Sequence, residues 1–208
     1  MHISTLQYIT TSPEGAERAC RGGVRWVQLR VKNQPYAIWK QLALETQAVA
    51  RRYGATLLIN DNPRLAQDIG ADGVHLGQAD TPPAEARAML GATFIIGGTA
   101  NTFADVQRHA AAGVDYVGLG PFRFTSTKEK LSPILGLAGY ADILRQCRAA
   151  GLTVPIIGIG GVTLADVPDL LETGLHGVAV SGAIGAAAEP SAAAAQFVER
   201  LTLSISGS

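Results

Sequence analysis

The sequence predicts a single α/β domain in which eight parallel strands close into a barrel inside a ring of helices. Two observations lead to this fold class. Short apolar runs alternate with helix-like stretches eight times along the 208 residues, and each run ends in glycine or a polar residue. Eight strand–helix units are the number that closes a parallel sheet into a (β/α)8 TIM barrel, whose sites lie at the strands' carboxyl ends. We expect one domain over 1–208, with a frayed tail at 203–208.

The expected strands are rich in aliphatic and β-branched residues, as strands buried on both faces are. An open doubly wound sheet would give the same alternation and is the competing arrangement. The expected strands cover 6–10, 26–30, 56–60, 73–77, 94–99, 116–120, 155–160 and 177–181.

Helical periodicity between these runs predicts the outer helices. Ser12, Asn62 and Thr81 each precede a proline, a pattern in which the polar side chain caps a helix and proline takes its first position. Glycines that follow the periodic stretches are expected to end helices; they are Gly54, Gly91, Gly113, Gly151 and Gly174. The expected helices cover 13–21, 36–53, 63–69, 82–90, 103–112, 137–150, 164–172 and 191–201.

Composition narrows the class of function. Apolar residues make up 47% of the chain and charged residues 16%, which is typical of a globular protein, and no apolar run is long enough to cross a bilayer. Lysines and arginines number 17, as do aspartates and glutamates, so no net charge draws the chain to nucleic acid or a membrane. The N-terminus lacks a secretory signal pattern, which favours a cytoplasmic enzyme. Cys20 and Cys147 have no metal-binding spacing and are expected to be free thiols.

Three polar residues alternate at the end of the second expected strand. Gln28, Arg30 and Lys32 fall on one face, while the residues between them are apolar. A solvated strand end is the plain alternative. However, an unpaired cation is costly in a strand buried on both faces, so the pattern favours an anionic ligand at the barrel mouth.

Two aspartates follow the third and fourth expected strands. Asp61 and Asp80 each stand just before a residue expected to cap the next helix, Asn62 and Thr81. Capping by the aspartates themselves is the alternative. If the neighbours do the capping, both carboxylates are available for Mg²⁺, which typically takes one or two carboxylates, several waters and substrate phosphate oxygens.

The last strand endings indicate phosphate binding. The stretch after the sixth expected strand carries Thr125, Thr127 and Lys128, which can bond or neutralise phosphate oxygens, although a polar loop without ligand contacts would have the same composition. Gly161 follows the seventh strand, and Ser181 and Gly182 follow the eighth. Phosphate sites of such barrels usually lie after these two strands.

Taken together, these endings resemble the thiamine phosphate synthase family, from the first strand through the eighth. The family carries a Q-x-R-x-K strand, an N-D strand end, G-V-H-L-G-Q followed by Asp, a G-P-x-x-x-T-x-T-K loop and an I-G-G loop, and each has its counterpart here in the same order. The resemblance implies a TIM-barrel enzyme that joins hydroxymethylpyrimidine diphosphate to a thiazole phosphate and releases pyrophosphate with the help of Mg²⁺. It also suggests a homodimer.

The resemblance assigns roles to individual residues. It implies that Arg30, Lys32, Thr99 and Lys128 carry catalysis and, with Gln28 and Asn60, hold the pyrimidine diphosphate. Asp61 and Asp80 would bind Mg²⁺, and the thiazole phosphate would be held by Thr125, Thr127, Gly161, Ser181 and Gly182. The chain departs from the family's Ser-x-His after the fifth strand, where it has Thr99-Ala100-Asn101, and its final serine stands one position early.

Three other functions would use parts of the same pattern. A thiazole tautomerase should need neither a diphosphate site nor a metal site, and here it would lack the histidine after the fifth strand. A noncatalytic phosphate-binding regulator would not need two carboxylates opposite three cations. A generic phosphosugar isomerase would account for the glycines after the seventh and eighth strands but not for the Q-x-R-x-K strand. His75 is expected to be a hydrogen-bonded core residue, and the sequence gives no role to His2, His109 and His176.

Overall fold

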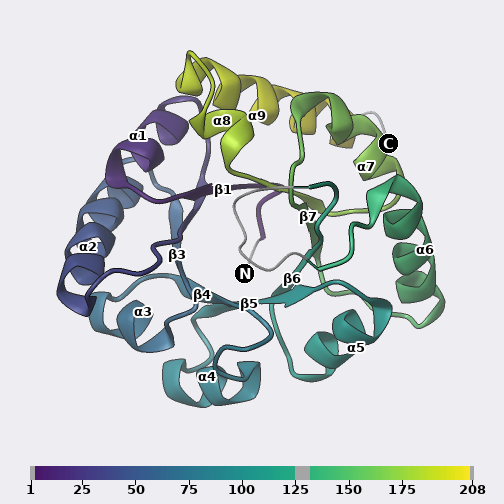
Figure 1. The fold of residues 1–208 in the computed structure, drawn as a ribbon, viewed down its shortest axis with the longest axis horizontal. Helices are drawn as coiled ribbons and strands as arrows, with labels where there is room; N and C mark the ends of the chain where they lie inside the picture. The colour runs from purple at the N-terminus through teal and green to yellow at the C-terminus, as the bar shows by residue number, and fades with distance from the viewer. Residues whose placement is uncertain (1–2, 125–131, 207–208) are drawn as a thin grey trace.

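Eight parallel strands form a closed barrel in the computed structural model, which describes residues 3–124 and 132–206. Each strand pairs with its neighbour in sequence, and β8 pairs with β1 to complete the ring (Figure 1). The closed ring confirms the TIM barrel and excludes the open sheet. The strands are β1 (Leu6–Thr10), β2 (Trp26–Leu29), β3 (Thr56–Asn60), β4 (Gly73–Leu76), β5 (Ile95–Ala100), β6 (Tyr116–Leu119), β7 (Ile156–Ile159) and β8 (Gly177–Val180).

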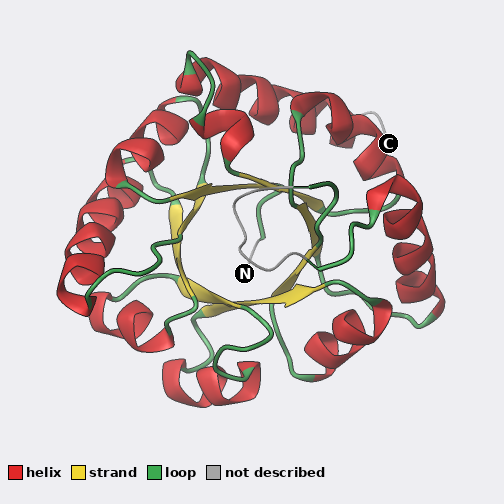
Figure 2. Cartoon of the chain, in the orientation of Figure 1, coloured by secondary structure: helices red, strands yellow, loops and turns green. Residues whose placement is uncertain are grey.

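Helices surround the barrel on all sides (Figure 2). Glycines at left-handed φ angles follow several of them as expected, among them Gly54 at +62° and Gly113 at +71°. The helices are α1 (Pro13–Arg21), α2 (Tyr36–Arg52), α3 (Pro63–Ile69), α4 (Pro83–Leu90), α5 (Phe103–Ala111), α6 (Gly136–Ala149), the 3-10 turn η1 (Leu164–Asp166), α7 (Val167–Glu172), α8 (Gly182–Gly185) and α9 (Pro190–Ser206).

The expected cap at Thr81 is wrong. Ser12 and Asn62 accept hydrogen bonds from Gly15 N and Leu65 N, but α4 starts one residue late, after Pro82. A residue before proline is disfavoured in the helical region, and because Pro83 follows it, Pro82 stays extended with ψ of 140°.

The C-terminal part of the chain also differs from expectation. One helical turn, α8, directly follows β8, and it is too short for periodicity to reveal. Helix α9 continues to Ser206, so 203–206 is helical instead of frayed, while 207–208 lies outside the described residues. The helix can run on because no glycine or proline interrupts 191–206.

Apolar side chains fill two layers. The larger lies between the barrel and the helices, with Val27 and Leu29 of β2 among its buried members. The smaller fills the barrel interior around Trp26, Leu58 and Tyr116. Gly97 makes room for the Tyr116 ring, since a Cβ at position 97 would lie 2.2 Å from its Cζ. Polar residues inside the barrel therefore pack against a filled apolar layer.

Other sequence expectations about the fold have clear outcomes. Cys20 and Cys147 are buried free thiols, as predicted. Among the described residues, no helix is long and apolar enough to cross a bilayer.

Candidate active site

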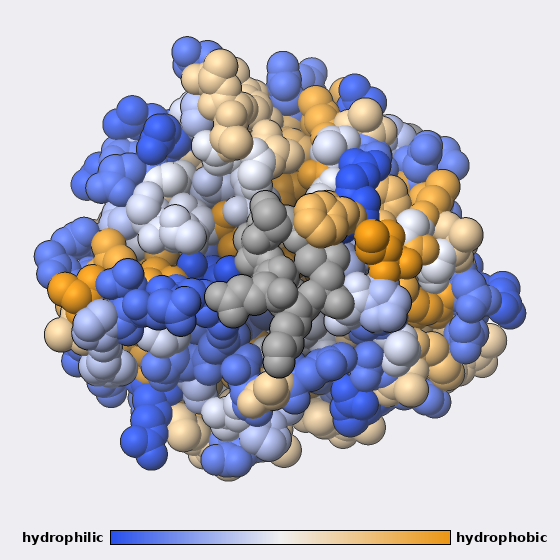
Figure 3. Space-filling view, viewed as in Figure 1, coloured by the Kyte–Doolittle hydropathy of each residue, from blue (hydrophilic) through white to orange (hydrophobic). Residues whose placement is uncertain are grey.

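Polar residues gather at the carboxyl ends of the first strands, as the sequence predicts. Figure 3 looks onto this end of the barrel, with hydrophilic side chains over the inner rim on the side of α2 and α3 and apolar ones beside α6, while further apolar side chains lie at the outer edge beside α2. The described apolar residues exposed near α6 include Phe124, Ile134 and Leu137. The rim thus has a polar side and a more apolar side.

A lysine and two aspartates lie in contact on the polar side. The Lys32 ammonium pairs with the Asp61 carboxylate, and the Asp61 and Asp80 carboxyl groups share a hydrogen bond. Asp80 Oδ2 also accepts from Gly77 N at 2.6 Å. The predicted proximity of these three residues is confirmed, but both carboxylates already have protein partners.

The backbone at Asp61 is unusual. Its φ is +63°, a region that residues other than glycine seldom adopt and that occurs more often at functional sites. Its N–H donates to the His75 carbonyl at 2.8 Å, while Asn62 caps α3. This arrangement turns the Asp61 carboxylate toward Lys32 and Asp80 instead of toward the helix.

The pKa values of the two carboxyl groups are shifted in opposite directions. Burial disfavours ionisation of Asp61, but the hydrogen bond from Asp80 and the charge of Lys32 outweigh it and hold the pKa of Asp61 below its usual range. Burial and the contact with Asp61 raise the pKa of Asp80. One ammonium group therefore does not fully compensate two adjacent carboxylates.

This donor set fits a divalent cation that also binds substrate. The two carboxyl groups share a proton where they hydrogen-bond, and Mg²⁺ could displace it while taking its other ligands from water and phosphate. Among the described residues, no third acidic, histidine or cysteine side chain joins them as a possible ligand. The pair therefore suits a shared metal better than a closed protein cage.

Arg30 and Asn60 complete the polar side of the rim. Arg30 follows β2, is partly exposed, and its backbone N–H donates to Thr10 O at 2.8 Å. Its guanidinium has no hydrogen-bond acceptor among the described residues. Asn60 is 5% exposed, and its Nδ2 has no partner in the same part of the chain. Buried polar groups are rarely left unpaired, so the Asn60 amide is available as a donor to a ligand.

Gln28 lies deeper than the sequence suggests. It is 1% exposed and donates to Gln7 Oε1 at 3.0 Å. Gln7 in turn donates to the Tyr116 hydroxyl at 3.1 Å. Gln28 thus belongs to a buried network inside the barrel, below Arg30.

His75 connects this network to Thr99. Its Nδ1 lies 2.8 Å from the Tyr116 hydroxyl and its Nε2 lies 3.0 Å from Thr99 Oγ1. Burial raises the pKa of Tyr116, so its hydroxyl remains protonated at neutral pH. The prediction that His75 is a hydrogen-bonded core residue is confirmed, but its contact with Thr99 was not predicted.

The structure gives Asn101 a local role in place of the family's histidine. The side chain is 8% exposed, and its Nδ2 donates to the carbonyls of Gly120 and Pro133 at 3.0 and 2.9 Å. Both donor hydrogens of the amide are therefore used to tie the end of β5 to the β6–α6 connection. An amide held in this way has no acid–base function.

The expected phosphate residues lie at the ends of β7 and β8. Gly161 has φ of +70°, Ser181 precedes α8, and Gly182 begins it. The N–H groups of Gly161 and Gly182 have no acceptor among the described residues. Thr125, Thr127 and Lys128 lie outside the described residues.

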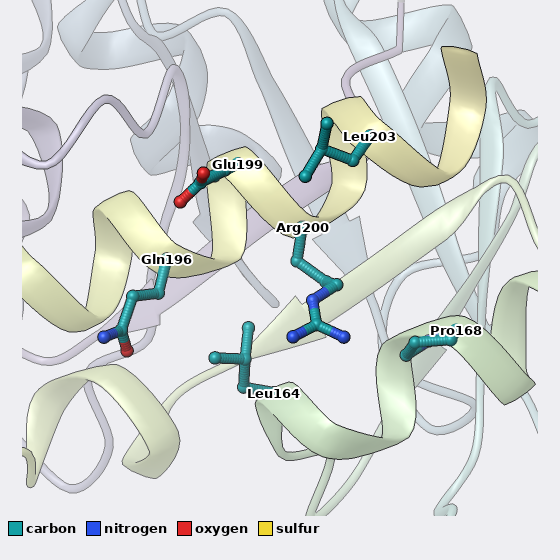
Figure 4. Close-up of a pocket in the computed structure, with 6 residues that line it drawn as sticks. All are labelled: Leu164, Pro168, Gln196, Glu199, Arg200 and Leu203. Atoms are coloured by element: carbon teal, nitrogen blue, oxygen red, sulfur yellow. The ribbon is translucent and has the colours of Figure 1, made fainter. Parts of the chain in front are cut away.

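Two hollows lie on the outside of the helix ring. One of ≈ 540 Å³ lies between α9 and η1–α7, with Arg200 pointing toward the space between Leu164 and Pro168 (Figure 4). The other has a similar volume and lies beside α2 and α3. The residues that line them include none of the predicted site residues, so neither replaces the barrel mouth as the candidate site.

Comparison with known proteins explains the polar and glycine-rich strand ends. The family model for thiamine monophosphate synthase matches residues 3–184, which include every described strand. The chain belongs to this family. The resemblance predicted from the strand endings is confirmed, and so is the prediction that the chain is a transferase.

Individual relatives extend the comparison. A thiamine-phosphate synthase of Phocaeicola vulgatus is 52% identical over 191 residues, covering 89% of this chain and 92% of the relative. The corresponding protein of Flavobacterium johnsoniae is 49% identical and covers 96% and 94%. The solved structure of thiamine phosphate pyrophosphorylase from Pyrococcus furiosus superposes with a TM-score of 0.85 at 25% identity, covering 97% and 96%.

Proposed function

We propose that this member of the thiamine monophosphate synthase family is itself a thiamine-phosphate synthase. It would join hydroxymethylpyrimidine diphosphate to a thiazole phosphate, or its carboxylate form, and release pyrophosphate. The observation that carries the proposal is the cluster of Lys32, Asp61 and Asp80, with Arg30 two residues before Lys32 after the same strand. A diphosphate with its metal needs such a cluster, and a monophosphate substrate alone does not.

The reaction needs charge stabilisation more than proton transfer. The bond between the pyrimidine's methylene carbon and the diphosphate oxygen breaks, and pyrophosphate leaves with the electron pair. The thiazole nitrogen then forms the new bond with its own lone pair, so no general base is required. Arg30 and Lys32, with Lys128, would stabilise the charge that develops on the leaving group, which is the kind of electrostatic contribution that often dominates catalysis.

Asn60 and Thr99 would orient the pyrimidine diphosphate. Asn60 Nδ2 is a buried donor without a described partner. Thr99 Oγ1 contacts His75 Nε2 at 3.0 Å, which limits the directions left to the hydroxyl. Gln28 would act from below as part of the buried network.

Asp61 and Asp80 would hold Mg²⁺. The bound ion would supply positive charge to the phosphate oxygens of the substrate. The like charge of the two carboxylates supports this assignment, because it favours a cation between or beside them.

The opposite side of the rim would hold the thiazole phosphate. The N–H groups of Gly161 and Gly182, which have no acceptor in the described part of the chain, suit phosphate oxygens. Hydroxyl groups from Ser181, Thr125 and Thr127 would complete the site. The two substrates would then lie side by side across the barrel mouth.

The thiazole tautomerase is the competing activity, and Asn101 argues against it. The side chain at this position is a neutral amide whose donors are bound to Gly120 and Pro133. The relatives argue against a regulator without catalysis, because the proteins that match this chain over most of their length are named synthases.

One assay tests the proposal. The purified protein is incubated with both substrates, with Mg²⁺ or with a chelator, and thiamine phosphate is measured. We expect product only with both substrates and the metal. Absence of metal-dependent product would overturn the proposal, and conversion of a thiazole substrate alone would favour the tautomerase.

A homodimer and a cytoplasmic location remain predictions. The dimer is suggested by the family resemblance alone. Light scattering of the purified protein would measure the first.

A further inference from the structure

An ion pair ties the start of the β6–α6 connection to the glycine loop after β7. Arg123 Nη1 and Nη2 each lie 2.7 Å from a carboxylate oxygen of Asp166. Nη1 also donates to the Gly161 carbonyl at 3.0 Å. Since β6 and β7 are neighbours in the barrel (Figure 1), the side chain crosses from one strand end to the next.

Both partners of this clamp, Arg123 and Asp166, are held by further contacts. The Arg123 guanidinium lies over the Phe122 ring, 4.7 Å from its centroid, and the Arg123 backbone N–H donates to Gly160 O at 3.0 Å. Asp166 Oδ2 accepts from both N and Oγ1 of Thr163 at 2.7 Å. A two-point arginine–carboxylate pair with its own supports fixes geometry better than a single surface contact does.

The loop that the clamp holds would otherwise be free to adopt many conformations. Gly160 and Gly161 are consecutive and have φ of +93° and +70°, and glycine loses the most conformational entropy when it is ordered. The glycine at 161 is also required for the clamp, because a Cβ there would lie 2.4 Å from Arg123 Cγ.

The clamp determines where the loop's donors point. The carbonyl of Gly161 and the N–H of Val162 belong to one peptide and point in opposite directions. With the carbonyl held by Arg123, the Val162 N–H is turned away from the clamp. Neither this N–H nor that of Gly161 has an acceptor among the described residues.

We infer that Arg123 and Asp166 are positioning residues that hold the Gly161–Val162 peptide ready to bind the phosphate of the thiazole substrate. This inference rests on the proposed function. The charge of Arg123 is already neutralised by Asp166, so Arg123 acts by fixing the loop and not as the counter-ion of the phosphate. The conformational entropy of the two glycines is then lost when the protein folds and not when the substrate binds.

The test separates the two substrates. In Arg123→Ala, we expect the KM for the thiazole phosphate, and its Kd by calorimetry, to rise about tenfold, the usual size of a loss of support behind a ligand. The KM for the pyrimidine diphosphate should stay within about twofold, since the described residues assigned to it follow other strands and do not contact Arg123. Arg123→Lys keeps the charge but loses the two-point pairing and should be intermediate.

Asp166→Asn distinguishes the clamp from direct phosphate binding. The asparagine keeps a side-chain oxygen that can accept from Thr163, but it weakens the interaction with Arg123. We therefore expect the same rise in the KM for the thiazole phosphate as in Arg123→Ala. The double variant should be no worse than either single one, because both remove one interaction. A lower thiazole KM in Asp166→Asn would mean that a released Arg123 binds the phosphate itself, and it would overturn the inference.

A matched control uses another arginine–aspartate pair. Arg145 and Asp142 of α6 form a pair at 2.5 Å whose side chains are 68% and 55% exposed, and Arg145→Ala should change neither KM. If Arg123→Ala does not fold, Arg123→Lys and Asp166→Asn provide the test. Unchanged thiazole KM and Kd in folded variants of an active enzyme would overturn the inference alone, whereas an inactive wild type would overturn the proposed function.

Discussion

At the scale of single residues, the Asp61 carboxylate makes two interactions. It pairs with Lys32 and shares a hydrogen bond with Asp80. In Asp61→Ala, we expect turnover to fall by about two orders of magnitude or more, because the proposed Mg²⁺ would lose a ligand and the leaving group would lose stabilisation. The same loss is expected for Lys128→Ala. The measurement is kcat over a range of Mg²⁺ concentrations.

A matched variant controls for the loss of an aspartate. Asp68 of α3 contacts Tyr36 and Lys40 on the outer surface, and Asp68→Ala should keep the wild-type Mg²⁺ dependence. If Asp61→Ala or Lys128→Ala turns over at near the wild-type rate, that residue has no part in the mechanism.

Tyr116 is a second single residue with a testable effect. Its hydroxyl contacts His75 Nδ1 at 2.8 Å and Gln7 Nε2 at 3.1 Å. Tyr116→Phe leaves both partners buried without it, which costs about 1–3 kcal/mol in the free energy of unfolding. Because His75 also contacts Thr99, we expect kcat to fall and the KM for the pyrimidine diphosphate to rise. Urea unfolding and steady-state kinetics measure the two effects.

Tyr140 provides the comparison for Tyr116. It is also fully buried, but its hydroxyl lies near the carbonyls of Leu119 and Ile159. Tyr140→Phe should lower stability while leaving the KM for the pyrimidine diphosphate unchanged. Equal kinetic effects in both variants would show that the Tyr116 network does not act specifically on Thr99.

At the scale of elements, the start of α5 is stabilised by Asp105. Its Oδ2 accepts from the N–H groups of Asn101 and Thr102 at 3.0 and 3.1 Å, and its Oδ1 accepts from Arg108 at 2.7 Å. Burial opposes ionisation of Asp105, but these hydrogen bonds outweigh it and lower the pKa of the carboxyl group. The cap also fixes Asn101, which holds the β6–α6 connection.

The lowered pKa of Asp105 gives a pH dependence with a definite sign. The ionised form is favoured in the folded state, so its stabilisation is present above the unfolded pKa of about 3.9 and is lost as pH falls through the folded value. Asp105→Asn should lower the free energy of unfolding by about 1–2 kcal/mol at neutral pH. The difference from wild type should be steady between about pH 7 and 5 and shrink below about pH 4.

Urea unfolding at these pH values measures the effect, with Asp142→Asn as the control. Asp142 is 55% exposed on α6, and its variant should stay close to wild type at neutral pH. A difference between Asp105→Asn and wild type that grows as the pH falls would contradict the assigned role.

At the scale of the whole molecule, the sequence predicts the barrel well because periodicity and strand count are properties of the chain itself. It also predicts that Lys32, Asp61 and Asp80 meet, since adjacent parallel strands end together. It does not predict contacts that depend on side-chain direction, such as His75 with Thr99 or Arg123 with Asp166. The missed start of α4 has a local reason in Pro83, and α8 is a single turn without a periodic signal.

Helix α9 follows the residues that the family model matches, and it packs against both the first and the last helices of the ring. It contacts α1, α7, α8 and β1 (Figure 1), and Phe197 is 2% exposed in the main core. Phe197→Ala should lower the free energy of unfolding by about 3–5 kcal/mol, because it removes a buried aromatic ring and leaves a cavity.

Leu203→Ala on the same helix, where the side chain is 64% exposed, should change the free energy of unfolding by no more than about 0.5 kcal/mol. Both variants should keep wild-type KM values at temperatures where they are folded, because neither residue lies at the barrel mouth. Urea unfolding followed by circular dichroism measures the two changes. Equal stability of the two variants would mean that α9 does not unfold together with the barrel.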